Sequence, residues 1–155
     1  MNNDIMNYNN SLEYAVEYFS KAIQETIRAF HKKHGFPISH EEYIILETIH
    51  LSPGIKQIDI ANKILMQRSY VGKLLNKLAE LKYIERKAEI KGKRQIIYKN
   101  YLTKNGEKLY LSINTSIVNE VIKVTTNEQR EDAYILSKKL IDLANKLKED
   151  SNLDF

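Results

Sequence analysis

The chain has 155 residues, of which 43% are hydrophobic and 28% are charged, and it contains no cysteine. This length suits one domain with a real core and is short for two independent domains of typical size. The missing cysteines exclude disulfides, thiolate metal sites and cysteine-based redox sensing. No apolar run approaches the roughly 20 residues that a membrane span needs, and the polar first ten residues lack the pattern of a secretory signal. We therefore expect a cytoplasmic protein with no membrane partner.

The formal net charge of +4 is unevenly distributed along the chain. Between Lys56 and Lys104 there are 13 Lys and Arg residues but only four acidic ones, so this segment carries +9 and the rest of the chain −5. A basic middle between acidic ends is typical of a surface that binds a polyanion. A lysine-rich, merely solvated surface is the alternative interpretation.

Apolar residues at helical spacing predict a long first helix from Leu12 to His34, which ends where Gly35 supplies a C-cap. Phe36-Pro37 then favours an extended step. Ser39 and Glu42 have the spacing of a capping box, and they predict a second helix that ends at Ser52-Pro53-Gly54.

Two short helices are expected next, over residues 57–65 and, after a bend at Met66-Gln67, on to about Leu81. Their expected buried side chains are Ile58, Ala61 and Ile64 or Leu65 in the first, and Val71, Leu74 or Leu75, Leu78 and Leu81 in the second. Residues 83–87 and 95–102 read as strands joined by a polar turn at Gly92. They predict a β-hairpin directly behind the helix pair.

Helical periodicity resumes beyond Thr103 and returns after a break at residues 126–129. The last helix carries a heptad seam of Ala133, Leu136, Leu140, Leu143 and Leu147. The outer helices hold more apolar surface than so small a core can cover. Apolar helix faces that have no partner in their own chain usually pack against a second copy of that chain. A homodimer is therefore expected.

The predicted fold class is mainly α with a small β-hairpin wing (α+β), in one domain over residues 1–155. A winged helix-turn-helix, residues 39–103, is inserted in a helical dimerisation region formed by residues 11–35 and 104–149.

The polar side chains of this lobe are the types that pair with phosphates and base edges in a major groove. On the second short helix they are Arg68, Ser69, Tyr70, Lys73, Asn76 and Lys77, with Gln57 at the start of the first. The hairpin tip adds Lys91, Lys93 and Arg94, positive charges suited to the DNA backbone or minor groove. Double-stranded DNA is therefore the expected partner, although a helix pair with a solvated polar face would look similar.

Four segments of this lobe resemble the MarR (multiple-antibiotic-resistance regulator) family of bacterial winged-helix transcription factors. They are Gln57-Ile58-Asp59-Ile60-Ala61, the recognition-helix segment from Arg68 to Leu78, Leu81-Lys82-Tyr83-Ile84-Glu85-Arg86, and Leu102-Thr103-Lys104-Asn105-Gly106. The resemblance extends from about Leu12 to Leu147. It implies a homodimer that binds a short palindrome, represses or activates nearby genes and responds to a small ligand.

The chain departs from the family pattern at two places. Lys82 stands where members often have Gly, which we expect to alter only the turn. The wing tip, Lys91-Gly92-Lys93-Arg94, lacks the Asp that commonly orients an Arg in the family. Arg94 is nevertheless the best candidate for a minor-groove arginine.

The resemblance suggests which residues contact the bases of the DNA and which contact its phosphates. Two copies would place their recognition helices in successive major grooves about 34 Å apart. Ser69, Tyr70 and Asn76 would read bases, and Arg68, Lys73 and Lys77 would divide between bases and phosphates. Gln57 would offer the N-terminus of the first short helix to a phosphate.

Family ligands lie between the dimerisation region and the DNA-binding lobe, so the resemblance suggests a small aromatic effector there. The candidate lining residues are Tyr14, Tyr18, Phe36, His40 and Tyr43, although aromatic residues at this spacing also serve as ordinary core. Zinc-sensing relatives use further histidines in the fifth helix that this chain lacks, so neither a metal nor a cofactor is expected. The absence of cysteine argues against peroxide sensing.

Two other classes of function are weaker. The chain has no Gly-rich phosphate loop, nucleophile elbow or paired metal motif, so it is not expected to be an enzyme. A winged-helix module that binds another protein without sequence-specific DNA binding remains the alternative. Such a module would need apolar residues on the outer face of the second short helix, where this chain has Arg68, Lys73, Asn76 and Lys77.

Overall fold

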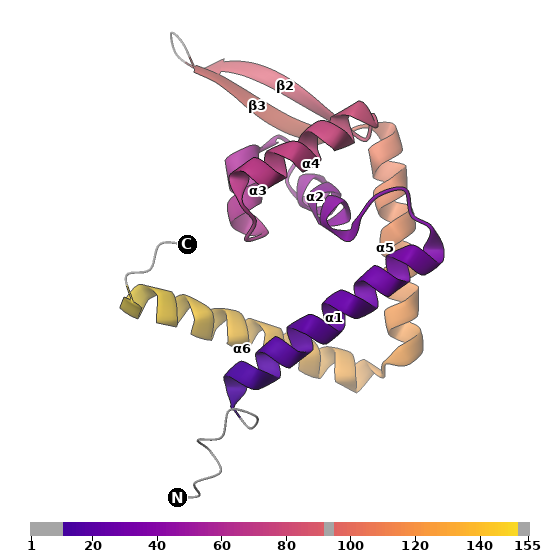
Figure 1. Cartoon of the computed structure of the whole chain (residues 1–155), viewed down its shortest axis with the longest axis vertical. Coiled ribbons are helices and arrows are strands. Elements are labelled where there is room, and N and C mark those ends of the chain that lie inside the picture. Colours follow the sequence, from indigo (N-terminus) through magenta and orange to yellow (C-terminus); the bar gives the residue numbers. More distant parts are fainter. Residues whose placement is uncertain (1–10, 92–94, 152–155) are drawn as a thin grey trace, which may run out of the picture. The chain divides into compact units, whose positions relative to one another are not determined.

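The computed structural model describes residues 11–91 and 95–151, which form one compact unit up to Ile113 and another from Asn114 onward (Figure 1). In order, the elements are α1 (Leu12–His34), α2 (His40–Leu51), β1 (Ile55–Lys56), α3 (Gln57–Lys63), α4 (Arg68–Glu80), β2 (Ile84–Lys91), β3 (Gln95–Leu102), α5 (Lys104–Val124) and α6 (Asn127–Ser151). The predicted fold class, mainly α with a β-hairpin wing, is confirmed. The division into a DNA-binding lobe and a dimerisation region stays a prediction.

The first two helices begin and end where the sequence predicts. Gly35 follows α1 with a left-handed φ of +62°, and its N–H donates to the carbonyl of Lys32. The capping box of α2 is complete, since the Glu42 N–H donates to Ser39 Oγ at 3.2 Å and the Ser39 N–H donates to Glu42 Oε2 at 2.8 Å. Both signals depend on local backbone chemistry and are therefore readable from sequence.

The core of the first unit lies among α2, α3, α4 and the start of α5. Its fully buried members include Ile45, Leu46, Ile49, Ile60, Val71, Leu75, Leu78 and Ile113. The expected burial of Ile58 and Leu81 is wrong, because these side chains are 43% and 44% exposed. Of the alternatives Ile64 and Leu65, Ile64 is half-buried and Leu65 is 79% exposed. The inward face of α3 is formed by Ile60 and Ala61, whereas Leu65 and Leu81 lie beyond the ends of their helices.

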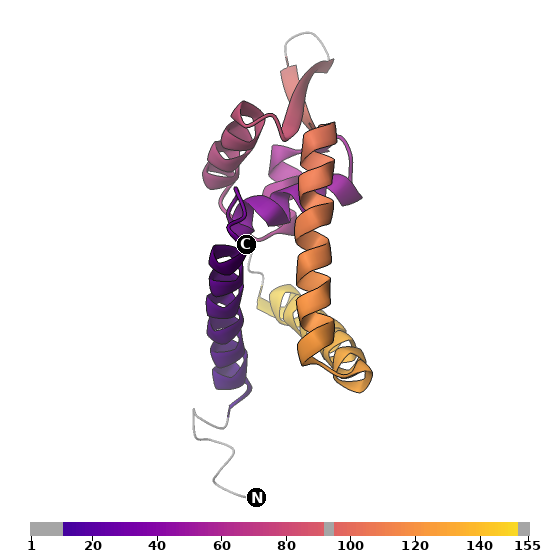
Figure 2. The same cartoon turned by 90° about the vertical axis from the view of Figure 1, so that its right-hand side faces the viewer.

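The three strands form an antiparallel sheet in the order β1-β3-β2. The wing hairpin pairs from Ile84↔Leu102 to Lys91↔Gln95, so its first strand is longer than the predicted residues 83–87. The strand β1 was not predicted, because two residues carry no periodicity. It is held by buried Asn100, whose Nδ2 donates to the Ile55 carbonyl at 2.8 Å. Figures 1 and 2 show the wing strands projecting past α3 and α4.

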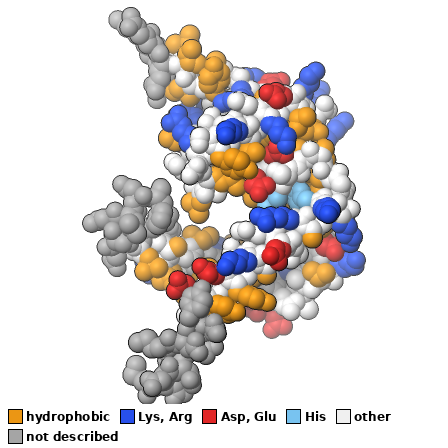
Figure 3. All heavy atoms as spheres, viewed as in Figure 1, with side chains coloured by type: hydrophobic (Ala, Val, Ile, Leu, Met, Phe, Trp, Pro, Cys, Tyr) orange, Lys and Arg blue, Asp and Glu red, His pale blue; other side chains and the backbone are white. Residues whose placement is uncertain are grey.

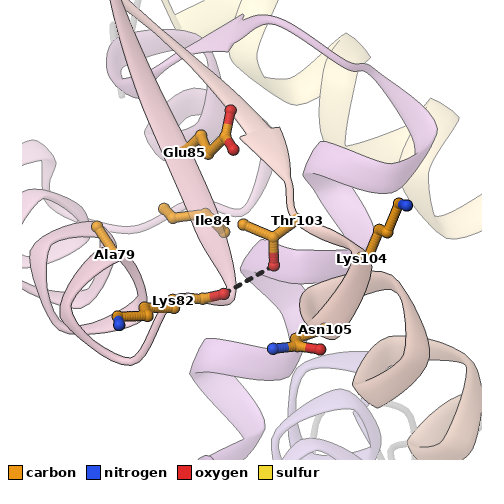
Figure 4. Close-up of a pocket in the computed structure, with 7 residues that line it drawn as sticks. All are labelled: Ala79, Lys82, Ile84, Glu85, Thr103, Lys104 and Asn105. Atoms are coloured by element: carbon orange, nitrogen blue, oxygen red, sulfur yellow. Dashed lines mark hydrogen bonds between the residues drawn. The ribbon is translucent and has the colours of Figure 1, made fainter.

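The wing joins α5 through the predicted Leu102–Gly106 motif. Thr103 Oγ1 donates to the Lys82 carbonyl at 2.7 Å, the bond drawn in Figure 4, and accepts from the Gly106 N–H at 3.1 Å. A Cβ on Gly106 would lie 1.9 Å from the Tyr83 carbonyl oxygen, so only glycine permits this close approach. Lys82 itself has φ +61°, which explains why a glycine is favoured at this turn.

An open hollow of about 460 Å³ lies beside this joint and is lined by Ala79, Lys82, Ile84, Glu85, Thr103, Lys104 and Asn105 (Figure 4). It lies at the base of the wing, away from the polar side chains that the sequence assigns to DNA.

The second unit contains the end of α5 and the whole of α6. Thr126 caps α6, because the Gln129 N–H donates to its Oγ1 at 3.2 Å and its own N–H donates to Gln129 Oε1 at 2.9 Å. Leu136, Leu143 and Leu147 of the predicted seam are exposed in the single chain. Within the described residues, no helix combines the length and apolar character needed to cross a membrane.

Candidate nucleic-acid interface

The helix α4 separates its apolar and polar residues onto two faces. Val71, Leu74, Leu75 and Leu78 are buried in the core. The six predicted contact residues, Arg68, Ser69, Tyr70, Lys73, Asn76 and Lys77, are all exposed. The helix therefore presents basic, amide and hydroxyl groups to solvent.

A groove of about 420 Å³ runs between the first turns of α3 and α4 and the wing. It is lined by Lys56, Gln57, Ile58, Arg68, Arg86, Ile96, Ile97 and Tyr98. Its three cationic side chains suit phosphates, and its apolar side chains suit the sugar edge of a nucleic-acid backbone. Figure 3 shows Lys and Arg side chains over the helix-turn-helix part of the surface and an apolar group along the projecting wing.

Arg86 of β2 links three elements at this groove, and the sequence did not assign it to the site. Its guanidinium donates to Asn76 Oδ1 on α4 and, at 3.2 Å, to Gln57 Oε1 on α3. It also lies over the Tyr98 ring of β3, 5.3 Å from the ring centroid. The family-like segment that ends at Arg86 was noticed, but no sequence pattern shows which side chains this arginine contacts.

Gln57 completes the network by reaching across α4. Its Nε2 donates to the Arg68 carbonyl at 2.9 Å, while its Oε1 accepts from Arg86. Gly72 makes room for this crossing, since a Cβ there would lie 2.7 Å from Gln57 Nε2. Both ends of the Gln57 amide are engaged inside the protein, and the predicted contact of the α3 N-terminus with a phosphate stays a prediction.

Lys77 is also engaged within the lobe. Its Nζ lies 2.7 Å from Oε1 of Glu42, a buried carboxylate at the start of α2. Among the predicted α4 residues, Lys77 and Asn76 therefore have intramolecular partners, whereas Arg68, Ser69, Tyr70 and Lys73 extend the exposed face at the start of the helix.

The predicted wing-tip contacts fall at the edge of the described chain. Lys91 is the last residue of β2, and its side chain lies outside the described residues, as do Lys93 and Arg94. Their contribution to DNA binding stays a prediction.

The effector candidates fall into two groups. Phe36 and His40 pack around the buried ring of His31, with centroids 5.3 and 5.4 Å away, and Tyr43 lies 6.1 Å from His40. Tyr14 and Tyr18 pack against each other at 6.0 Å near the other end of α1. Since 17 residues of helix span about 25 Å, one chain does not bring all five candidates together.

The ring cluster of His31, Phe36, His40 and Tyr43 is an unusual environment for polar groups. Both ring nitrogens of His31, which is 8% exposed, are buried without a hydrogen-bond partner among the described residues. Burial and the adjacent His31 lower the pKa of His40. Burial and the neighbouring Glu47 raise the pKa of Tyr43. No group of three His, Asp or Glu residues in the described chain is arranged to hold a metal ion.

Residues 34–95 match the model of the MarR family. These residues hold α2, the helix-turn-helix and the first wing strand, β2. No curated protein sequence matches the chain.

Solved structures show the same fold over most of the chain. A MarR/EmrR family transcriptional regulator from Acinetobacter sp. ADP1 is 20% identical with a TM-score of 0.72, covering 91% of this chain and 99% of that one. The PcaV transcriptional regulator from Streptomyces coelicolor, in complex with its natural ligand, is 14% identical with a TM-score of 0.68, covering 86% and 96%. A MarR family protein of Mycobacterium tuberculosis in complex with salicylic acid is 18% identical with a TM-score of 0.60, covering 83% and 95%.

Proposed function

We propose that this chain, whose residues 34–95 match the MarR family model, is a winged-helix transcriptional regulator of that family and binds double-stranded DNA in a sequence-specific manner. It acts as a homodimer on a pseudo-palindromic operator. Its regulatory role is repression, released by a small aromatic ligand.

One observation carries the proposal. The exposed face of α4, with Arg68, Ser69, Tyr70 and Lys73, continues into the cationic groove beside the wing. A major groove admits a helix, and the adjoining groove would receive the phosphate backbone next to it. The outer face of α4 is polar, which is the opposite of what the protein-interaction alternative requires.

Dimer formation is supported by large apolar side chains that are exposed. They lie on α1 (Leu12, Val16, Phe19 and Ile23) and on α6 (Leu136 and Leu143). Exposed apolar stripes of this kind usually pack against a second copy. A symmetric dimer would place two recognition helices about 34 Å apart, one helical turn of DNA.

The direct test is fluorescence anisotropy with the DNA upstream of the protein's own gene and a scrambled duplex of equal length, each over a salt series. If six to ten phosphates are neutralised per dimer, affinity should fall by about 10³ to 10⁵ between 50 and 200 mM salt. Weak and equal binding to both duplexes would reject sequence-specific DNA binding and favour the protein-interaction module.

The effector is proposed because two proteins of similar fold were solved with a natural ligand and with salicylic acid. In this chain Phe36, His40 and Tyr43 are the candidates that lie together. Salicylate added to the preformed complex should release the DNA, with benzoate and acetate as ligands of decreasing similarity. No release by any aromatic acid would leave the DNA-binding proposal intact and remove salicylate-like acids as effectors.

A further inference from the structure

Asn76 is held in one orientation by an arginine that does not itself belong to the recognition helix. We propose that Arg86 makes Asn76 a hydrogen-bond donor toward DNA, so that each half-site carries guanine, and not adenine, where Asn76 reaches a base. This inference rests on the proposed binding of double-stranded DNA and deepens it by naming a determinant of base preference.

The orientation of the amide follows from the chemistry of its partner. A guanidinium carries N–H donors and no acceptor, so only the oxygen of an amide can face it. Arg86 contacts Oδ1 of Asn76, which leaves the two hydrogens on Nδ2 to point elsewhere. Asn76 is exposed on α4, so those hydrogens are available to a ligand of the recognition helix.

The base preference follows from which atoms each purine presents in the major groove. Asparagine recognises adenine in a bidentate way, because its oxygen accepts from N6 while its nitrogen donates to N7. In this chain an adenine amino group would have to share the Asn76 oxygen with the N–H groups of Arg86, next to the positive charge of the guanidinium. Guanine presents two acceptors, N7 and O6, which suit the N–H groups of Asn76 Nδ2 and require nothing of its oxygen.

Arg86 is itself fixed by other parts of the lobe. Its second terminal nitrogen donates to Gln57 Oε1 at 3.2 Å, and its guanidinium lies over the Tyr98 ring. Gln57 is anchored in turn by its 2.9 Å bond to the Arg68 carbonyl, in the space left by Gly72. An arginine remains charged at all ordinary pH values, so it stays a donor.

The experiment is selection of binding sites from a randomised duplex pool by the full-length protein and its variants. The position read by Asn76 is identified as the one whose preference disappears in Asn76→Ala. Guanine and adenine are then exchanged at that position and affinities are measured by anisotropy at one salt concentration. The variants are Arg86→Met, which keeps an apolar stem and removes every donor, and Arg86→Lys, which keeps one donor.

Lys87→Met is the matched control. It removes the same charge from the neighbouring residue of β2, whose Nζ lies 5.0 Å from the centroid of the Tyr101 ring, on the other side of the strand. Lys87→Met should weaken binding to every duplex and keep the guanine preference.

The wild-type protein should favour guanine over adenine at this position by about tenfold, the size of one good base contact. Arg86→Met should shift the preference toward adenine, and Arg86→Lys should restore part of it. Adenine preference in the wild type, an unchanged preference in Arg86→Met, or no position that depends on Asn76 would each overturn the inference. If Arg86→Met fails to fold, the preference of the wild-type protein for guanine or adenine at this position tests the inference on its own. Absence of any selected site for the wild type would instead reject the proposed function.

Discussion

The Nζ atom of Lys77 lies 2.7 Å from Oε1 of Glu42, a carboxylate whose side chain is 1% exposed. The other oxygen of Glu42 accepts the N–H of Ser39 and so completes the cap of α2. One buried carboxylate therefore connects the start of α2 to α4. The lysine that the sequence assigns to DNA is the partner that compensates this charge.

Removing Lys77 should cost more stability than removing a comparable lysine of the same helix. Lys77→Ala leaves the Glu42 carboxylate buried without its partner, which should lower the free energy of unfolding by about 1–3 kcal/mol. Exposed Lys73 is the matched control, and Lys73→Ala should change it by less than about 0.5 kcal/mol. Urea denaturation followed by circular dichroism measures both. Equal costs would show that the Glu42–Lys77 pair contributes nothing.

A methyl group at Gly106 should damage the joint between the wing and α5. The added Cβ would lie 1.9 Å from a backbone oxygen of Tyr83, which cannot turn aside as a flexible side chain would. Gly106→Ala should therefore destabilise the protein by about 3 kcal/mol, despite the better helix propensity of alanine.

Gly35 provides the comparison for that substitution. A Cβ at Gly35 meets nothing within 4 Å, but the residue has a φ of +62°. Gly35→Ala should cost only about 1 kcal/mol, from backbone strain alone. Thermal unfolding of the two variants side by side would contradict the steric argument if Gly106→Ala were the milder change.

The ring cluster around His31 should make stability depend on pH. Because burial and His31 lower the pKa of His40, the unfolded chain binds a proton at His40 more readily than the folded chain does. Stability should therefore be full above the unfolded pKa of about 6.5 and fall as the pH drops below it.

His40→Phe removes that titration and should flatten the stability profile between pH 6.5 and pH 5. His34→Phe, at an exposed position of α1, is the control and should leave the slope unchanged. Denaturant midpoints measured at several pH values give the pH dependence of stability for each protein. An equal slope in the wild type and in His40→Phe would assign the pH dependence to other groups.

Arg68 and Lys93 should differ in what their loss does to DNA binding. Arg68 lines the groove at the start of α4, so Arg68→Ala should relax base preference and cost about 1–3 kcal/mol on the operator. Lys93→Ala should weaken operator and random DNA alike and reduce the salt slope by about 1. Anisotropy on both duplexes separates the two roles, and identical behaviour of the two variants would reject the division.

Most elements could be predicted from the sequence because their signals are local. The capping box of Ser39 and Glu42, the glycine after α1 and the strand over residues 95–102 were all confirmed. β1 escaped prediction because its two residues join the sheet through Asn100, 45 positions from Ile55. The exposure of Ile58 depends on which side of a seven-residue helix meets the core, and so short a helix gives little periodicity to decide it.

The sequence predicted which types of residue form the candidate site, but not which hydrogen bonds and ion pairs join them. The residue types on α4 indicated a nucleic-acid surface, and the apolar period correctly turned them outward. That Arg86 contacts Asn76 and Gln57 follows only from the folded path of three separate elements. The same holds for Lys77, whose partner lies 35 positions earlier in the chain.

The contact between Gly106 and the Tyr83 carbonyl has a mechanical consequence. Two backbones that touch directly have no side chain between them whose rotation could absorb a displacement. Thr103 fastens the same joint with bonds to both Lys82 and Tyr83. The first turns of α5 and the start of β2 therefore form a rigid joint. A rotation of those turns would move the wing by the same amount.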